Sequence, residues 1–298
     1  MCKSTSKPKG KPAWLKKSLP KGGDYQRVTR LLAKADLHTV CQEANCPNMF
    51  ECFSKNTSTF MILGDQCTRH CRFCNVTSKP PLAVDPGEPA NVANAVMDLG
   101  LKYVVVTSVT RDDLEDGGAG HFADVIRAVR EAGEKADHMI RVEVLIPDFK
   151  GHMTALEKVV NACPDVINHN IETVAALYPR VRPEAIYSRS LELIRTVKEL
   201  NPKIPTKSGI MVGLGETREQ LVATFEDLYA HRCEMLTIGQ YLQPTRNHLH
   251  VEKYYTPEAF DELETVARKI GFKQVAAGAF VRSSYKAEDL FSQPMATY

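Results

Sequence analysis

The chain has 298 residues, enough to bury a sizeable core, and its formal net charge is only +2, with 25% of the residues charged. This balance gives no overall electrostatic reason for a nucleic-acid partner. No apolar run approaches the roughly 18 residues that span a bilayer, and the N-terminus has no apolar segment of a signal peptide. We therefore expect a soluble, cytoplasmic protein that is monomeric and binds neither nucleic acid nor membrane.

A basic arm opens the chain. Residues 1–22 contain seven lysines, and no acidic residue comes before Asp24. Such an arm is usually disordered and solvated, and the alternative is that it docks on an acidic partner.

Six of the nine cysteines fall between residues 41 and 74, in two triplets. The triplets are Cys41, Cys46 and Cys52, spaced C-x4-C-x5-C, and Cys67, Cys71 and Cys74, spaced C-x3-C-x2-C. A secreted disulfide framework would spread its pairs over a much shorter chain, so the clustering indicates metal. Of the other cysteines, we expect Cys163 and Cys233 to be buried in the core.

Three thiolates leave one ligand position of a metal site open. Soft thiolates suit iron, and an iron–sulfur cubane normally takes four cysteines. A metal with an open position can bind and activate a substrate, so we expect the missing ligand to be a small molecule. The alternative is a zinc site completed by His70 or His38, although His70 directly precedes Cys71 and neighbouring loop residues rarely chelate one tetrahedral ion.

From residue 59 onward, short apolar runs alternate with amphipathic helix patterns. Because their apolar residues are nearly continuous, the runs are typical of parallel strands buried on both faces. The predicted strands are residues 59–63, 102–108, 141–148, 165–172, 207–216 and 235–244.

The helix patterns between these strands have recognisable ends. Gly100 predicts a C-cap, and Thr217 with Gln220 predicts a capping box. Pro257, which follows a threonine, and Gly271 mark the first turn and the end of another helix.

The β-α order, repeated about six times, favours a partial parallel (β/α)6 TIM-like barrel over a doubly wound sheet. We assign the barrel to residues 59–276. Residues 1–58 then form an extension with the basic arm and the first cysteine triplet, and residues 277–298 form a C-terminal tail.

Polar residues follow several predicted strands, at the end where barrel enzymes carry their active sites. Thr107, Ser108, Arg111 and Asp113 are candidates for holding a cofactor, and the alternative is a solvated loop that caps the next helix.

Another polar group follows the fourth predicted strand. Asn170 and Glu172 are suited to the hydroxyls of a ribose, and Arg182 is suited to a carboxylate. His169 is expected to be a hydrogen-bonded core histidine.

The second triplet, in CTRHCRFC, directly follows the first predicted strand and resembles the signature of the radical S-adenosylmethionine (SAM) enzymes. The resemblance implies that Cys67, Cys71 and Cys74 hold a 4Fe–4S cluster whose open iron binds the amino and carboxylate groups of SAM. Phe73 occupies the position that lies by the adenine in this family.

The first triplet, ahead of the second, is similar to that of the lipoyl synthases within this superfamily, as is RSSY at residues 282–285. The similarity extends from about residue 24 to the tail. It implies that Cys41, Cys46, Cys52 and Ser283 hold an auxiliary 4Fe–4S cluster that donates sulfur, with Ser284 as the less favoured ligand.

The implied activity is the insertion of sulfur at carbons 6 and 8 of an octanoyl chain on a lysine of another protein. The implied partners are an octanoylated lipoyl carrier domain or glycine cleavage H protein, an electron donor such as ferredoxin or flavodoxin, and a cluster-assembly carrier. One rival is another radical enzyme such as biotin synthase, which would not carry the first triplet. A second rival is a zinc-stabilised nucleic-acid-binding module, which the low net charge opposes.

Overall fold

The computed structural model describes residues 12–15, 24–44, 46–54, 58–285 and 287–292. Its strands are β1 (His38–Thr39), β2 (Thr59–Ile62), β3 (Gln66–Cys67), β4 (Thr77–Ser78), β5 (Tyr103–Ser108), β6 (Arg141–Leu145), β7 (Val166–Asn168), β8 (Thr206–Val212), β9 (Met235–Gln240) and β10 (Gln274–Gly278). Eight of them form one sheet in the order β1-β2-β5-β6-β7-β8-β9-β10, in which only β1 and β2 pair antiparallel.

All six predicted strands are present, so the prediction of a partial parallel barrel is confirmed. Within the described residues the sheet runs from β1 to β10 without closing. β10 was not predicted, because QVAAG is short and rich in small residues. Its parallel pairing with β9 supplies the missing stabilisation.

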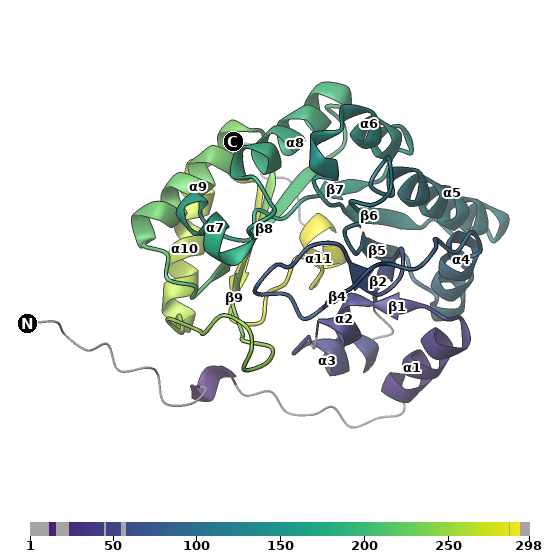
Figure 1. Ribbon diagram of the computed structural model, residues 1–298, viewed down its shortest axis with the longest axis horizontal. Coiled ribbons are helices and arrows are strands. Elements are labelled where there is room, and N and C mark those ends of the chain that lie inside the picture. Colours follow the sequence, from purple (N-terminus) through teal and green to yellow (C-terminus); the bar gives the residue numbers. More distant parts are fainter. Residues whose placement is uncertain (1–11, 16–23, 45, 55–57, 286, 293–298) are drawn as a thin grey trace, which may run out of the picture.

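The predicted helix ends are also confirmed. Gly100 ends one helix in the left-handed conformation at a φ of 65°, Thr217 and Gln220 make both bonds of a capping box, and Gly271 ends a third helix that Pro257 begins. The α-helices are α1 (Asp24–Lys34), α2 (Val40–Glu43), α3 (Met49–Ser54), α4 (Glu88–Leu99), α5 (Ala119–Lys135), α6 (Met153–Asn161), α7 (Tyr178–Val181), α8 (Tyr187–Leu200), α9 (Arg218–Ala230), α10 (Pro257–Ile270) and α11 (Ala287–Ser292). Helices α4, α5, α6, α8, α9 and α10 lie on the outside of the curved sheet (Figure 1).

The strands are buried on both faces, as their continuous apolar runs predicted. Val104, Val106, Val142 and Val144 of β5 and β6 are fully buried in the same core cluster as Ile126 of α5. Each such side chain contributes about 1.5–3 kcal/mol relative to exposure, and the rigid barrel that results carries the loops of the site.

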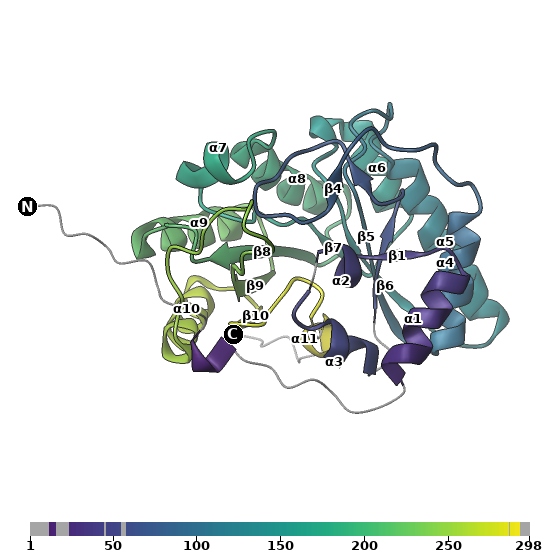
Figure 2. The ribbon, with the colours of Figure 1, turned by 60° about the horizontal axis from the view of Figure 1, so that its bottom comes forward.

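Helix α11 of the tail packs on the barrel end opposite the C-terminal strand ends. Leu290 of α11 packs with Val166 and Met235, which begin β7 and β9, and the Phe291 ring packs at a tilt against Tyr103 of β5, 5.7 Å between ring centroids. Figure 2 shows α11 close to β10 of the sheet. The chain between β10 and α11 carries the Arg282–Tyr285 segment.

One of the two cysteines expected in the core is exposed. Cys163 has a positive φ of 53° and is exposed, so that prediction was wrong, whereas Cys233 is buried as predicted.

The basic arm lies outside the described residues except for residues 12–15. None of the helices in the described ranges has both the length and the apolar character needed to cross a bilayer.

Candidate active site

A cavity of about 550 Å³ lies at the C-terminal ends of the strands. Both cysteine triplets line it, and so do most of the residues predicted to contact SAM, with Arg111 and Asp113 as the exceptions. The predicted site residues on its wall are Cys41, Cys46, Cys52, Cys67, Cys71, Phe73, Cys74, Thr107, Ser108, Asn170, Glu172, Arg182 and Ser283. The fold thus brings segments of the extension, the barrel and the tail together around one cavity.

A buried ion network anchors the loop of the second triplet. Arg69, only 5% exposed, donates to Asp112 at 2.7 Å and to the fully buried Asp148 at 2.5 Å. Burial alone would raise the pKa of Asp148, but the bonds from Arg69 hold it at about 2. The loop between Cys67 and Cys71 is therefore fixed to the barrel by a permanent ion pair.

The cysteines of this loop are surrounded by hydrogen-bond donors. The backbone N–H groups of Arg69 and Thr110 donate to Cys67 Sγ at 3.5 and 3.3 Å, and His248 Nε2 donates to the carbonyl of Cys74 at 2.9 Å. Burial raises the pKa of the Cys71 thiol to about 11 and that of Cys74 to about 12. These thiols keep their protons at neutral pH unless a metal displaces them.

The donor set fits iron–sulfur clusters better than a single ion. In the described part of the chain, no three His, Cys, Asp or Glu side chains converge closely enough to hold one metal ion. A cubane does not require this convergence, because each thiolate binds a different iron. The histidines of the zinc alternative have carboxylate neighbours instead: His70 lies 3.1 Å from Glu184, and His38 lies 3.8 Å from Glu43.

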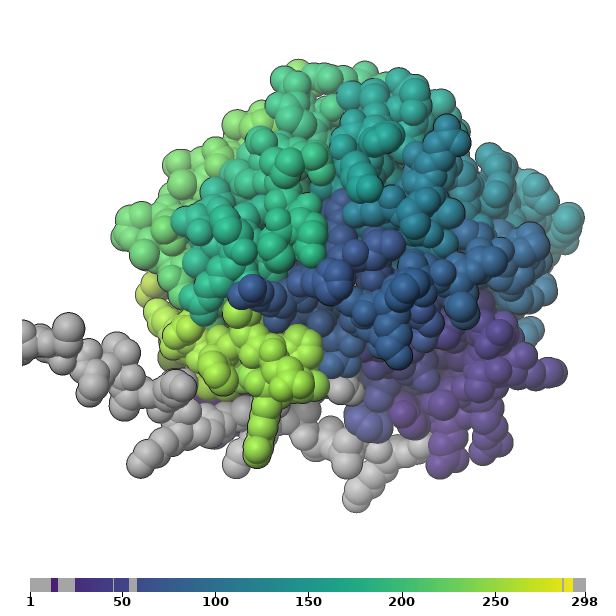
Figure 3. Space-filling model, viewed as in Figure 1, coloured from purple at the N-terminus to yellow at the C-terminus, as the bar shows by residue number. Residues whose placement is uncertain are grey.

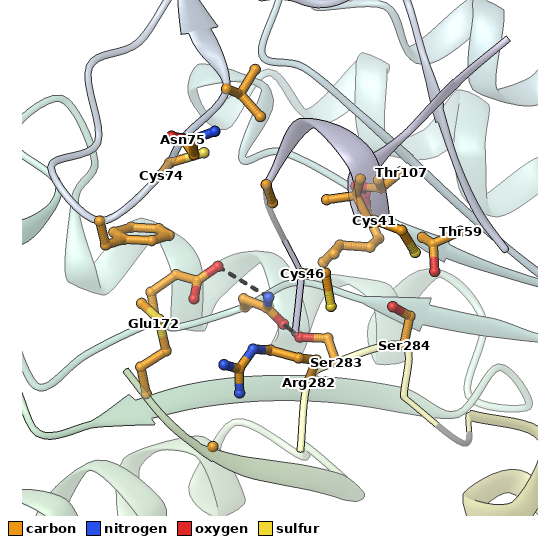
Figure 4. A pocket seen from close by; sticks show the side chains of 18 of the residues that line it. Cys41, Cys46, Thr59, Cys74, Asn75, Thr107, Glu172, Arg282, Ser283 and Ser284 are labelled. Atoms are coloured by element: carbon orange, nitrogen blue, oxygen red, sulfur yellow. Dashed lines mark hydrogen bonds between the residues drawn. The ribbon is translucent and has the colours of Figure 1, made fainter. Parts of the chain in front are cut away.

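The first triplet forms the opposite wall, and the tail is bonded to it. Asn48 donates to the carbonyl of Phe280 at 2.7 Å, and the Tyr285 hydroxyl donates to Glu51 at 3.0 Å. Burial raises the pKa of Cys41 to about 12. Figure 4 shows Cys41 and Cys46 on one side of the cavity and Cys74 on the other.

The two serines of the tail segment face different groups. Ser283 donates to the side-chain oxygen of Asn170 at 2.8 Å, and Asn170 donates to Glu172 at 3.0 Å. Figure 4 shows Ser284 on the side of Cys41 and Thr59. A side chain at Gly209 would meet the Ser283 hydroxyl at 2.7 Å, so this strand position admits only glycine beside the tail.

Arg182, the residue predicted to bind a carboxylate, leaves its Nε donor without a hydrogen-bond partner. Arg182 is 8% exposed, donates to the carbonyl of Asn170 at 2.9 Å and lies 5.2 Å from the ring centroid of Tyr178. Its Nε and the hydroxyl of Ser108 are buried without a hydrogen-bond partner. Burial raises the pKa of Glu172 above its usual range. Unsatisfied buried donors on the wall of a cavity indicate a polar ligand.

Two candidates from the sequence do not reach the cavity wall. Arg111 instead donates to Asp113 at 2.8 Å, and this ion pair lowers the pKa of the Asp113 carboxyl.

His169 lies at the cavity but bonds to the carbonyl of Ile146 and to Ser190, and burial lowers its pKa to about 4. The prediction of a hydrogen-bonded core histidine is confirmed.

Sequence reasoning missed the residues that hold the cysteine loop in position. Arg69 was visible inside CTRHC, but its partners Asp112 and Asp148 lie 43 and 79 residues away. His248 lies 174 residues from Cys74. The available signal was that Asp112 follows a predicted strand end, as the cysteine loop itself does.

Known proteins resemble this chain over nearly its whole length. Residues 61–228 match the model of the radical SAM superfamily, and residues 2–46 match that of the N-terminal domain of lipoyl synthase of the radical SAM family. The lipoyl synthase of Alkaliphilus metalliredigens is 54% identical, covering 94% of this chain and 96% of its own length. That of Desulfotalea psychrophila is 54% identical, covering 95% and 93%.

Solved structures share the fold at low identity. A maturase of the FeFe-hydrogenase gives a TM-score of 0.58 at 14% identity, covering 84% of this chain and 63% of its own. Methylornithine synthase gives 0.54 at 12% identity, covering 84% and 74%. From the family models and the closely similar sequences, the chain belongs to the lipoyl synthases of the radical SAM superfamily.

Proposed function

We propose that this enzyme inserts sulfur at carbons 6 and 8 of a protein-bound octanoyl chain, forming the lipoyl cofactor. The observation that carries the proposal is the single cavity with one cysteine triplet on each side and unsatisfied polar groups on its wall. Such a cavity holds a radical source and a sulfur source within reach of one substrate.

Cys67, Cys71 and Cys74 hold the 4Fe–4S cluster to which SAM binds. When bound, the cluster and SAM supply a 5'-deoxyadenosyl radical, which removes hydrogen from unactivated C–H bonds that side-chain acid–base chemistry cannot break. The chain's own residues orient SAM.

The unused Nε donor of Arg182 suits the carboxylate of the methionyl group. Glu172 and Asn170 suit the ribose hydroxyls, and Phe73 suits the adenine. Thr107 and Ser108, at the end of β5, complete the polar wall.

Cys41, Cys46 and Cys52 hold the auxiliary cluster, with a serine of the tail as its fourth ligand. A hard alkoxide among soft thiolates binds iron weakly, which suits a cluster that gives up its sulfur. Ser283 is the ligand we propose, although its hydrogen bond to Asn170 must then be exchanged for iron. Ser284 is the second candidate.

Two alanine variants distinguish these serines. The variant that removes the ligand loses lipoyl formation and part of its iron but still cleaves SAM, whereas the other variant keeps both activities. Full lipoyl formation by both Ser283→Ala and Ser284→Ala would contradict a serine ligand.

The proposed partners are an octanoylated lipoyl carrier domain or glycine cleavage H protein, an external one-electron donor such as ferredoxin or flavodoxin, and a carrier that rebuilds the auxiliary cluster. We propose that the chain acts as a cytoplasmic monomer. Its three parts are the extension of residues 1–58, the barrel of residues 59–276 and the tail of residues 277–298.

Mass spectrometry tests the proposed reaction. The anaerobically reconstituted enzyme is incubated with SAM, dithionite and an octanoylated lipoyl-domain peptide. We expect the peptide to gain two sulfur atoms with two SAM molecules consumed. Cleavage of SAM with no sulfur in the peptide would contradict the proposal.

A further inference from the structure

A second hollow, of about 530 Å³, lies against the outer face of the cysteine loop. Residues from the segments 70–78 and 247–252 line it together with Arg180 of α7, and Figure 3 shows these three segments meeting on one face of the molecule. Cys71 and Cys74 line both this hollow and the 550 Å³ cavity. The cysteine loop is therefore the wall between the two spaces, and the hollow gives access to the cluster ligands from outside.

The surroundings of the hollow are mainly basic. Arg72 and Arg180 line it, and Lys79, Arg246 and Lys253 directly flank its lining segments in the sequence; all five side chains are exposed or half-buried. Among the described residues that line the hollow, Glu252 is the one carboxylate, and it binds Arg180 at 2.9 Å; nearby, Glu184 lies 3.1 Å from His70. Arg72, on the wall, makes no ion pair within the described residues. His248 and His250 also line the hollow.

Backbone bonds join this surface rigidly to the cluster ligands. The Arg72 N–H donates to the carbonyl of Val181 at 2.9 Å, and the Leu249 N–H donates to the carbonyl of Arg72 at 3.3 Å. His248 bonds directly to the carbonyl of Cys74. Only the cysteine loop would thus separate a partner bound here from the cluster, and the surface would not need to rearrange.

We propose that this hollow is the docking site of an acidic one-electron carrier protein, an inference that rests on the proposed function. Each SAM cleavage takes up one electron: the sulfonium is reduced, its bond to the 5' carbon breaks, and the carrier is oxidised by one electron. Electron-transfer partners form small, transient interfaces in which complementary charge sets the association rate. The unpaired Arg72 and its basic neighbours match an acidic carrier, and the surface is separate from the cavity that receives the octanoyl substrate.

Two reductants separate docking from catalysis. SAM cleavage by Arg72→Glu and Arg180→Glu is measured with reduced flavodoxin and, separately, with dithionite, which needs no docking site. Lys135→Glu, at the exposed end of α5, is the matched control for charge. We expect each arginine variant to lose about ten-fold in kcat/KM for flavodoxin at low salt, with the dithionite-driven rate and iron content unchanged. The control should keep both rates, and added salt should slow the flavodoxin reaction of the parent enzyme.

The outcomes are distinguishable. Arginine variants that keep the flavodoxin rate would overturn the docking site, and so would variants that lose the dithionite rate equally. A parent enzyme that cleaves no SAM even with dithionite would instead refute the proposed function, and the docking inference with it.

Discussion

Asp148 tests whether the buried anchor of the cysteine loop organises the site. Its fully buried carboxylate bonds to Arg69 and Arg189 and accepts from the backbone N–H of Lys150. A pKa of about 2, against an ordinary 3.8, corresponds to about 2 kcal/mol in favour of the folded, ionised state. Asp148→Asn also removes one of the two carboxylates that pair with Arg69. We therefore expect the unfolding free energy to fall by about 3 kcal/mol in total.

Thermal unfolding of the metal-free protein measures this loss. For a chain of this size Tm changes by about 2 °C per kcal/mol, so Asp148→Asn should lower Tm by about 6 °C at pH 7. Because the pKa of Asp148 is lowered on folding, its stabilisation is present above about pH 4 and is lost as the pH falls toward 2, where the two proteins should converge. Asp261→Asn, at an exposed position of α10, is the control.

The same variant should also bind less iron at the second triplet after reconstitution, because its loop is no longer fixed. A Tm within about 1 °C of the parent protein, together with unchanged iron content, would refute the anchor.

Three further predictions concern the ligands. Cys46→Ala should abolish lipoyl formation but keep SAM cleavage, as measured by product analysis, and full lipoyl formation would contradict the sulfur-donor role. Arg182→Ala should raise the Kd for SAM about ten- to a hundred-fold, because a buried charged hydrogen bond is lost. Arg182→Lys should recover part of the binding. An unchanged Kd in equilibrium dialysis would show that Arg182 does not contact SAM. Lys16→Glu and Lys17→Glu, which lie outside the described residues, should raise KM for an acidic lipoyl domain, and turnover independent of salt would count against docking by the basic arm.

Local patterns in the sequence were enough to predict the fold. Six strands came from continuous apolar runs, and the ends at Gly100, Thr217 and Gly271 came from capping chemistry that needs only a few neighbouring residues. Cys163 was misjudged because its place depends on a turn at positive φ, where the side chain points to solvent.

The site was predictable where its residues form motifs and not where they meet through the fold. The cysteine triplets and the RSSY segment are local patterns, and the structure gathers them at one cavity. The partners of Arg69 come from loops after two other strands, so they are brought next to Arg69 only when the barrel has formed. Arg111 and Asp113 were offered as cofactor ligands, but they are two residues apart and bond to each other.

We propose that two clusters share one cavity, each held by its own cysteine triplet. Iron and acid-labile sulfide per chain, measured after anaerobic reconstitution, test it most directly. The parent protein should contain about eight of each, at roughly four per cluster, and a variant with alanine at all three cysteines of either triplet should contain about four. Loss of all iron from one triple variant, about four irons in the parent protein, or zinc in place of iron would contradict the account.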